Sequence, residues 1–285
     1  MQKKIGNVLG LFDGMSCGQI ALNRVGIKYD NYFASEIKPH AIKVTKYNYP
    51  NTIHIGDITK VDFSELPKID LLIGGSPCQD FSRANKERKG LRGDKSSLFY
   101  YYLKALDICK PKYFLLENVI MGSENTQIIS NELGVYPVRI NSSLVSAQLR
   151  DRQYWTNIQG DDIPDFYGRS ISQPKDKKIT LQSILIDGYA DRNKARCLLE
   201  SDSRRLTTPK KMMHRYFSKG FTTLVFGDLK EKENTCRYLN QTELERCQTA
   251  PDGYTKILTR DQAACLLGDG WTVDVICHIL KGIKK

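Results

Sequence analysis

Residues 70–82 read Asp-Leu-Leu-Ile-Gly-Gly-Ser-Pro-Cys-Gln-Asp-Phe-Ser. An apolar run that is followed by two glycines and a proline is typical of a buried β-strand that ends in a loop. Similar runs alternate with amphipathic stretches throughout the first half of the chain. The predicted strands are Asn7–Phe12, Tyr32–Ser35, Ile69–Ile73 and Tyr113–Glu117, and the predicted helices are Gly18–Val25, Pro39–Tyr47 and Ser97–Ile108. This alternation predicts an α/β fold with a mainly parallel sheet and helices on both faces.

The sequence changes its character after Asn157. An acidic pair, a lysine-rich stretch at Gln173–Lys178 and a basic stretch at Arg204–Lys219 interrupt any regular alternation. This pattern predicts a smaller, separate region with long loops. Helical patterns then resume at Asn240–Cys247, Asp261–Leu267 and Val273–Leu280.

Composition limits the class of protein. The 285 residues are 40% hydrophobic and 26% charged. No stretch approaches the roughly 18 apolar residues that a membrane span needs, so we expect none. The N-terminal residues Met1–Ile5 are basic and run into a strand-like segment without a small-residue cleavage site, which predicts no secretory signal. The chain is therefore expected to be intracellular.

The cysteines are candidates for several kinds of chemistry. The eight cysteines form no Cys-x-x-Cys pair and the four histidines add no ligand spacing, so we expect no metal site. In a reducing compartment most cysteines are small buried residues. Cys78 differs from the others because it follows a predicted strand and a glycine pair. It is the cysteine whose surroundings favour catalysis.

The formal net charge of +11 favours a polyanionic partner, although the same charge also serves solubility. The position of the charge is more informative, because no acid lies between Asp202 and Asp228. In this interval basic residues are interleaved with His214, Tyr216 and Phe217, as at a nucleic-acid surface. The basic residues are Arg204, Arg205, Lys210, Lys211, Arg215 and Lys219.

Residues that follow the predicted strands are candidates for ligand binding, because ligands of parallel sheets bind at the carboxyl ends of the strands. The first strand runs into Phe12–Gly18, a turn with two glycines that opens a helix. Such a turn lets a ligand approach the backbone, although it is structural about as often. Glu36 follows the strand Tyr32–Ser35, and Asp57 lies where a further strand, third in the chain and before Ile69–Ile73, is expected to end near Gly56-Asp57-Ile58. Acids at these places can bind ribose hydroxyls and an exocyclic amine. The pattern predicts an adenosine pocket and does not separate a dinucleotide from S-adenosylmethionine.

Cys78 and Glu117 follow two further strands at the same predicted edge. A thiolate near backbone amides at a strand end can attack an electron-poor ring carbon. A carboxyl group opposite it could hold a ring nitrogen. Taken singly, such a cysteine is more often a buried thiol and such a glutamate a surface acid. Their joint position beside the adenosine pattern favours a catalytic edge.

These segments resemble, in order, the successive motifs of the DNA (cytosine-5) methyltransferase family. The matching segments are Phe12-Asp13-Gly14, Glu36 with Asp57, Pro77-Cys78, Glu117-Asn118-Val119, Gln148-Leu149-Arg150-Asp151-Arg152, Arg205-Leu206-Thr207-Thr208 and Gly268–Ile276. The resemblance covers most of the chain and is specific, because the motifs follow one another in family order. In motif detail the chain is most similar to the de novo type. Asp269-Gly270 and Asp274 depart from the family's usual residues.

The resemblance implies a Rossmann-like S-adenosylmethionine-dependent methyltransferase fold with a smaller target-recognition region. Residues 1–158 would form the catalytic and cofactor-binding domain, residues 159–250 the target-recognition region, and residues 251–285 C-terminal helices that return to the first domain. The implied reaction moves a methyl group to carbon-5 of a flipped-out cytosine in double-stranded DNA through a covalent Cys78 intermediate. Glu117 would bind the ring nitrogen and amine, and Arg150 and Arg152 would hold the flipped nucleotide.

The same resemblance implies further binding residues. Those for the cofactor are Phe12, Asp13, Gly14, Met15, Cys17, Glu36, Ile37, Asp57, Ile58, Ser76, Pro77, Leu98, Gly270, Trp271 and Thr272. Those for DNA are Ser82, Arg83, Lys86, Arg88, Asn118, Gln148, Arg205, Thr207, Lys210, Lys211 and Arg215. Gln79–Ser97 would be a loop that fills the gap left by the flipped base, and Arg204–Gly227 would read a short target site.

Several alternatives remain at this point. An RNA cytosine methyltransferase shares the catalytic plan, and a non-catalytic relative would keep the fold. A nicotinamide-dependent dehydrogenase explains the first three strand ends but leaves Cys78 and Glu117 without a role. Phe99–Tyr102 is compatible with a homodimer interface, because the matching region of the de novo subgroup forms one. A bacterial or phage-encoded enzyme of this kind would work in the cytoplasm or nucleoid.

Overall fold

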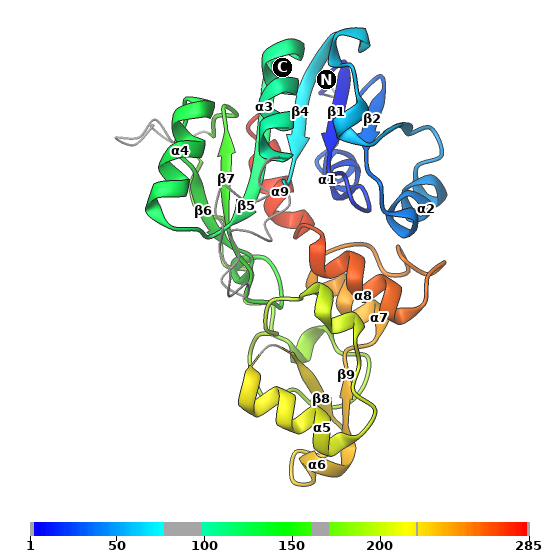
Figure 1. The fold of residues 1–285 in the computed structure, drawn as a ribbon. Helices are drawn as coiled ribbons and strands as arrows, with labels where there is room; N and C mark the ends of the chain where they lie inside the picture. Colours follow the sequence, from blue (N-terminus) through cyan, green and yellow to red (C-terminus); the bar gives the residue numbers. More distant parts are fainter. Residues whose placement is uncertain (1–2, 77–97, 161–170, 221, 284–285) are drawn as a thin grey trace. The chain divides into compact units, whose positions relative to one another are not determined.

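The computed structural model describes residues 3–76, 98–160, 171–220 and 222–283 (Figure 1). The chain divides into two compact units, and each is discontinuous in sequence. Unit 1 comprises Met1–Ile140, Asp151–Gln173 and Ile276–Lys285, whereas unit 2 comprises Asn141–Arg150 and Pro174–Val275. The three-part division expected at residues 158 and 250 stays a prediction.

Unit 1 is built on a seven-stranded sheet with the order β3-β2-β1-β4-β5-β7-β6. Its strands are β1 (Asn7–Leu11), β2 (Tyr32–Ser35), β3 (Ile53–Gly56), β4 (Ile69–Gly74), β5 (Tyr113–Val119), β6 (Val138–Asn141) and β7 (Asp151–Thr156). The first five strands pair in parallel, and β7 pairs with β5 in the antiparallel sense. The predicted α/β class with a mainly parallel sheet is therefore confirmed. The sequence did not predict β6 and β7.

Helices cover both faces of this sheet, as predicted. Leu72 of β4 packs in one core cluster with Phe99 and Tyr102 of α3 (Leu98–Cys109). The next residue, Ile73, points the other way, because a Cβ on Gly18 of α1 (Cys17–Arg24) would lie 2.2 Å from its Cδ1. Adjacent strand residues point to opposite faces, so α1 and α3 lie on opposite sides of the sheet.

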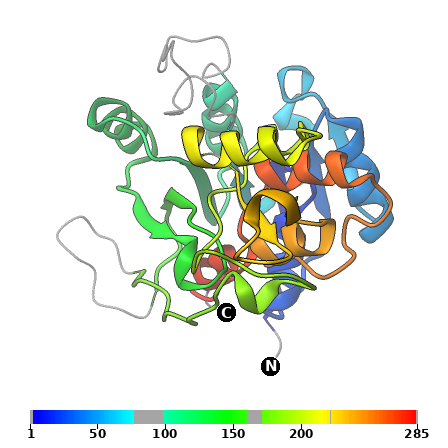
Figure 2. The same ribbon diagram turned by 90° about the horizontal axis from the view of Figure 1, so that it is seen from below.

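Unit 1 has two further helices between its strands. Helices α2 (Pro39–Asn48) and α4 (Ser123–Leu133) lie at opposite ends of the sheet in both views (Figure 1, Figure 2). Trp155 of β7 is fully buried and donates from Nε1 to Ser130 Oγ of α4 at 3.0 Å. Short 3₁₀ turns follow β3 at η1 (Ile58–Lys60) and η2 (Phe63–Glu65). The strand order reverses between β1 and β4, which is where ligands bind in open α/β sheets.

Unit 2 has short elements and a small core of its own. A two-stranded antiparallel sheet packs with the helix that precedes it through Met212, Met213, Tyr216, Leu224, Phe226, Cys236 and Tyr238. The elements are η4 (Ser142–Leu144), η5 (Gln182–Ile184), η6 (Glu200–Ser203), α5 (Pro209–His214), the π-helix η7 (Arg215–Lys219), β8 (Leu224–Phe226), α6 (Lys232–Thr235), β9 (Cys236–Tyr238), α7 (Gln241–Cys247) and α8 (Arg260–Asp269). The predicted helices at Asn240–Cys247 and Asp261–Leu267 are confirmed as α7 and α8.

The stretch Arg260–Leu280 contains α8 and α9 (Val273–Leu280) and is long and apolar enough to cross a membrane. This differs from the expectation that no stretch of the sequence approaches that length. The buried share of this apolar window is 67%, and residues 270–272 separate the two helices. Burial of this kind is typical of core helices. The expected absence of a membrane span stays a prediction.

Helix α8 approaches η6 so closely that one position admits no side chain. A Cβ on Gly268 would lie 2.3 Å from the carbonyl carbon of Leu199 and 2.5 Å from the amide nitrogen of Glu200. Both are backbone atoms, so no rotamer change can relieve the clash. The absence of a side chain at Gly268 therefore allows α8 to lie this close to η6.

Gly268→Ala is expected to lower the free energy of unfolding by about 1–3 kcal/mol, because overpacking at backbone contacts must displace α8 or η6. Urea denaturation followed by circular dichroism would measure it. Gly122→Ala is the comparison variant, since a Cβ there meets nothing within 4 Å and its loss should be limited to weaker capping of α4 by alanine, about 1 kcal/mol or less. Equal stability of the two variants would contradict the close packing of Gly268.

Candidate functional site

The turn after β1 has an unusual backbone. Phe12, Gly14 and Ser16 have φ values of 54°, 58° and 63°, whereas the residues between them do not lie in the left-handed region. Alternation of this kind curls the backbone tightly, and the N–H groups of Asp13, Gly14 and Ser16 all donate to acceptors within the protein. Left-handed Phe12 and Ser16 are strained, and such strain collects at functional sites. A Cβ on Gly14 would meet nothing within 4 Å, so the turn is open there.

The carboxyl group of Asp13 lies inside this turn. It accepts hydrogen bonds from the Ser16 hydroxyl and, at 2.5 Å, from the Tyr32 hydroxyl. Gln19 Nε2 donates to Ser16 Oγ at 2.9 Å and extends the network into α1. Burial raises the pKa of Asp13 to about 7, an effect that the two hydroxyl groups oppose and Glu36 reinforces. Asp13 therefore titrates close to neutral pH.

The stability of the protein is expected to fall as the pH rises toward 7. The pKa of Asp13 rises on folding from its ordinary value of 3.8 to about 7, so the folded state holds this proton more tightly. The resulting stabilisation is complete below the unfolded-state pKa and disappears as the pH passes the folded-state pKa. Melting temperatures measured between about pH 5 and pH 8 should fall more steeply in the wild type than in Asp13→Asn.

Asp107→Asn serves as the control for this experiment, because Asp107 is an exposed aspartate of α3. Its pH profile should follow that of the wild type. Parallel profiles for the wild type and Asp13→Asn would show that Asp13 does not titrate near neutral pH.

Glu36 lies beside the turn at the end of β2. Its Oε2 accepts from Gly14 N at 2.8 Å, and its Oε1 accepts from the backbone N–H groups of Ile37 and Lys38 at 2.7 and 2.8 Å. The Ile37 side chain is 67% exposed directly after this acid. The structure thus brings the predicted Gly14, Glu36 and Ile37 together, with an exposed apolar surface next to a carboxylate.

The other predicted cofactor residues of unit 1 differ in exposure. Asp57 is half-buried, and its Oδ1 caps η1 by accepting from Thr59 N at 3.0 Å, which lowers the pKa of Asp57. Leu98 is half-buried at the start of α3. Met15, Cys17 and Ile58 are buried at 1%, 3% and 5% exposure, so their side chains belong to the core that supports the turn.

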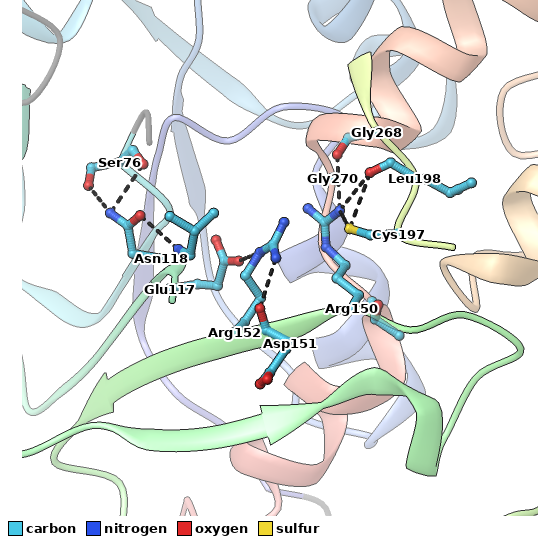
Figure 3. Close-up of polar contacts among 12 residues, drawn as sticks. Ser76, Glu117, Asn118, Arg150, Asp151, Arg152, Cys197, Leu198, Gly268 and Gly270 are labelled. Atoms are coloured by element: carbon cyan, nitrogen blue, oxygen red, sulfur yellow. Dashed lines mark hydrogen bonds and ion pairs between the residues drawn. The ribbon is translucent and has the colours of Figure 1, made fainter. Parts of the chain in front are cut away.

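The ends of β4 and β5 are joined by one side chain. Asn118 of β5 is buried and donates from Nδ2 to Ser76 Oγ at 3.0 Å (Figure 3). Ser76 is the last described residue before the segment that contains Pro77, Cys78, Ser82, Arg83, Lys86 and Arg88, and these six predicted site residues lie outside the described residues. Asn118 therefore fixes the chain two residues before Cys78, and its predicted contact with DNA stays a prediction.

Glu117 and Arg152 form an ion pair at the same strand end. Arg152 Nε lies 3.0 Å from Glu117 Oε1, and the two side chains are 13% and 10% exposed. Strand register explains the pair, because Arg152 lies opposite Val119 and so shares a sheet face with Glu117. Arg152 Nη1 also donates to the backbone oxygen of Asp151 at 2.9 Å. A carboxylate held by a guanidinium and still partly exposed can bind an amidine-like ring edge.

Arg150 and Gln148 make their contacts within unit 2. Arg150 is 3% exposed, and its Nη1 donates to the carbonyl oxygens of Leu198 and Gly268, each at 3.1 Å (Figure 3). Its Nε has no acceptor among the described residues. Gln148 is fully buried and bonded to unit 2 residues that include Gln248. These contacts within unit 2 were not predicted. The predicted contact of Arg150 with the nucleotide and that of Gln148 with DNA stay predictions.

The basic segment, Arg204–Lys219, contains predicted DNA-binding residues of two kinds. Arg205 pairs with Asp261 at 2.7 Å, and Arg215 donates to the backbone oxygens of Arg204 and Ser201 at 3.0 and 3.2 Å. These two arginines stabilise unit 2. Thr207, Lys210, Lys211 and the aromatic Phe217 are exposed, the last at 63%. They form an exposed basic and aromatic face on α5 and η7.

The aromatic run at the start of α3 divides between core and surface. Phe99 and Tyr102 are fully buried, whereas Tyr100 is 49% exposed. The homodimer expected at this run stays a prediction. Within the described ranges no cluster of three or more His, Cys, Asp or Glu side chains could hold a metal ion.

The closing segment, Gly268–Ile276, is held by Gln248, a residue outside it that the motifs did not indicate. Gly270 and Trp271 are half-buried and Thr272 is buried, and Gln248 Nε2 donates to the Gly270 oxygen at 3.1 Å. Gln248 bonds to partners distant in the sequence, so no local pattern in the sequence indicates it.

The chain matches the family model described as C-5 cytosine-specific DNA methylase over residues 6–194. Among curated relatives, the orphan methyltransferase M.SPRI of Bacillus phage SPR is 40% identical over 114 residues, which cover 39% of this chain and 26% of that protein. The type II methyltransferase M1.ScrFI of Lactococcus lactis subsp. cremoris is 30% identical over 243 residues, which cover 80% and 60%. The matched segments thus span less than two thirds of these relatives' own lengths.

Solved structures with low sequence identity share the fold. The methyltransferase EhMeth of Entamoeba histolytica aligns over 100% of both chains with a TM-score of 0.76 and 17% identity. The Dnmt2 methyltransferase of S. pombe covers 96% of this chain and 98% of its own, with a TM-score of 0.69 and 19% identity. At such identities the likeness concerns the fold alone, which is the Rossmann-like class that the sequence predicted.

Proposed function

Because the chain belongs to the C-5 cytosine-specific DNA methylase family, we propose that it methylates carbon-5 of cytosine in double-stranded DNA. The observation that carries the proposal is the pair of polar contacts at the edge of the unit 1 sheet where β4 and β5 end. There the Glu117–Arg152 pair joins β5 to β7, and Asn118 of β5 holds Ser76, which lies two residues before Cys78 in the sequence. The finer similarity to the de novo type stays a prediction.

The proposed cofactor is S-adenosylmethionine, which supplies the methyl group when it is bound. The residues present fit this group, since a Cβ on Gly14 would meet nothing within 4 Å and a ligand can therefore approach the backbone of the turn closely. Glu36 would accept hydrogen bonds from ribose hydroxyls beside the exposed Ile37, which offers an apolar surface for adenine. Asp57 would bind the exocyclic amine, and Gly270, Trp271 and Thr272 would close the pocket.

Carbon-5 of cytosine is a weak nucleophile, so the ring needs activation before it accepts a methyl group. We assign this step to Cys78, whose thiolate would add to carbon-6 and form a covalent intermediate. Glu117 would bind ring nitrogen 3 and the amine, and Arg152 would hold that carboxylate in place. Elimination of the thiolate after loss of the carbon-5 proton would release the methylated base.

The base must leave the double helix to reach such a site, at a cost of a few kcal/mol. The exposed Lys210, Lys211 and Thr207 of unit 2 are the proposed contacts to DNA, since lysines can neutralise phosphates. Ser82, Arg83, Lys86 and Arg88 are proposed contacts from the segment that follows Cys78. The relatives include methyltransferases of phage and type II systems, so the proposed setting is modification of phage or bacterial DNA.

Bisulfite sequencing of a plasmid incubated with the purified chain and S-adenosylmethionine tests the proposal. Cytosines at one short target site should become resistant to conversion. A tRNA transcript incubated in parallel covers the rival RNA activity and should stay unmodified. An unmethylated plasmid together with a methylated tRNA would replace the DNA proposal by the RNA one, and no product on either polymer would reject both.

A further inference from the structure

Three polar side chains form a buried cluster in unit 2. Gln148, Gln248 and Thr272 are 0%, 0% and 1% exposed, although they come from distant parts of the chain. Gln148 Nε2 donates to Gln248 Oε1 at 2.8 Å, and the Thr272 hydroxyl donates to the same oxygen at 2.9 Å. Fully satisfied buried networks of this kind fix one arrangement of the segments that they join.

The amide nitrogen of Gln248 completes the end of α8. The last carbonyl oxygens of a helix have no partner within the helix, and many helices satisfy them with a left-handed glycine. Gly270 at this C-terminus has a φ of −68°, so it does not make that turn. Gln248 Nε2 instead donates to the oxygens of Leu267 and Gly270 at 2.5 and 3.1 Å. A side chain from outside α8 therefore fixes how the helix ends.

The backbone of Gln248 adds a third contact to the same segment. Its carbonyl oxygen accepts from Val273 N at 2.9 Å, at the start of α9. The residues between the held positions remain accessible, since Asp269 is exposed and Gly270 and Trp271 are half-buried. Gln248 thus holds both ends of a short accessible segment.

The cluster also contacts the segment that leads into the basic face. Gln148 Oε1 accepts from Leu198 N at 3.2 Å, and Arg150 Nη1 donates to the oxygens of Leu198 and Gly268. Leu198 and Leu199 precede η6 directly. Gln148 and Arg150 therefore fix the position of Leu198, shortly before the basic segment, and Arg150 also fixes the end of α8.

We propose that Gln248, acting with Thr272, is a positioning residue that holds Gly270 and Trp271 in the conformation that binds the methyl donor. The inference rests on the proposed function, because it assumes that these two residues close the cofactor pocket. Gln248 has no exposed surface and cannot touch the cofactor itself. Gln248 instead holds the segment in its bound conformation before the cofactor arrives, so that binding does not include the entropy cost of ordering the segment.

Gln248→Met tests the proposal, because methionine has a similar volume and cannot donate or accept the four bonds. Isothermal titration of the full chain with S-adenosylhomocysteine should give a Kd at least about 10-fold higher than in the wild type, as expected for loss of pre-organisation. The emission of the half-buried Trp271, recorded in a Trp155→Phe background, should shift to longer wavelength before any ligand is added. Loss of stability alone would lower the number of binding sites without changing the Kd.

Gln241→Met is the matched control. Gln241 is the first residue of α7, the helix that Gln248 caps at its C-terminus, and it donates from Nε2 to the Thr255 oxygen at 2.7 Å, away from the closing segment. Its Kd for S-adenosylhomocysteine should equal that of the wild type. An unchanged Kd in Gln248→Met would overturn the inference, and so would an equal rise in both variants.

A second pair of variants covers the case in which Gln248→Met does not fold. Thr272→Val removes the hydroxyl that donates to Gln248, whereas Thr272→Ser retains it. The valine variant should bind S-adenosylhomocysteine less tightly by about 5-fold or more, as expected from one lost buried hydrogen bond, and the serine variant should recover most of the loss. Equal affinities would overturn the inference. Absence of binding by the wild type would instead reject the proposed cofactor.

Discussion

Replacing Cys78 with serine is expected to abolish methyl transfer to DNA, with a loss of rate of about 10⁴-fold or more, as when other enzymes lose their nucleophile. A serine hydroxyl stays protonated at neutral pH and cannot add to carbon-6 without a base beside it. Cys78 lies outside the described residues, so the prediction rests on the motif and on the fixed strand end before it. Single-turnover transfer of a tritiated methyl group to plasmid DNA would measure the loss.

The role of Cys78 can also be tested without measuring turnover, by trapping the covalent adduct between the protein and DNA. DNA that contains 5-fluorocytosine at the target should form a covalent complex with the wild type and none with Cys78→Ser. Cys109→Ser is the control, because Cys109 is a half-buried cysteine of α3 that has no proposed role. Wild-type rates in Cys78→Ser would refute the assignment of the nucleophile.

Glu117→Gln is expected to lower the rate of methyl transfer by about 10²–10³-fold, the usual effect of removing one group that stabilises developing charge. Glutamine keeps an oxygen that can accept from Arg152 Nε, which lies 3.0 Å from Glu117 Oε1. The strand end should therefore keep its structure while it loses the carboxylate that is proposed to bind the ring nitrogen. The rate at saturating DNA and S-adenosylmethionine would reveal this loss.

Glu124→Gln is the matched control for charge, since Glu124 is an exposed glutamate in the first turn of α4. It should methylate DNA at the wild-type rate. If Glu117→Gln stayed within about threefold of the wild type, Glu117 would be no more than a structural partner of Arg152.

The sequence predicted those parts of the fold whose signal is local. Leu72 and Ile73 lie in a continuous apolar run because β4 is buried on both faces, and such runs are easy to identify. Strand β7 was missed because Asp151–Thr156 begins with charged residues and pairs in the antiparallel sense with β5. Its place in the sheet is set by tertiary contacts that no periodicity shows.

Some residues of the candidate site could likewise be predicted from local sequence patterns, and others could not. Glu36 and Glu117 could be predicted, because each follows an apolar run at a strand end. The left-handed conformations of Phe12 and Ser16 could not, since nothing in those residue types favours them. Gln148 and Arg150 were assigned to nucleic acid from a motif, but their described bonds lie within unit 2. Polar side chains at long sequence separation need a structure before their partners can be identified.

The interleaved course of the chain limits how its parts could be exchanged between proteins. Unit 2 takes Asn141–Arg150 from between β6 and β7 and the rest from Pro174–Val275. A chimera joined at a single junction near residue 158 would inherit Gln248 from one parent and Gln148 from the other. Grafting a new target specificity onto this scaffold therefore requires transplanting both pieces, or confining the exchange to residues between Leu199 and Leu239, which leaves the buried cluster intact.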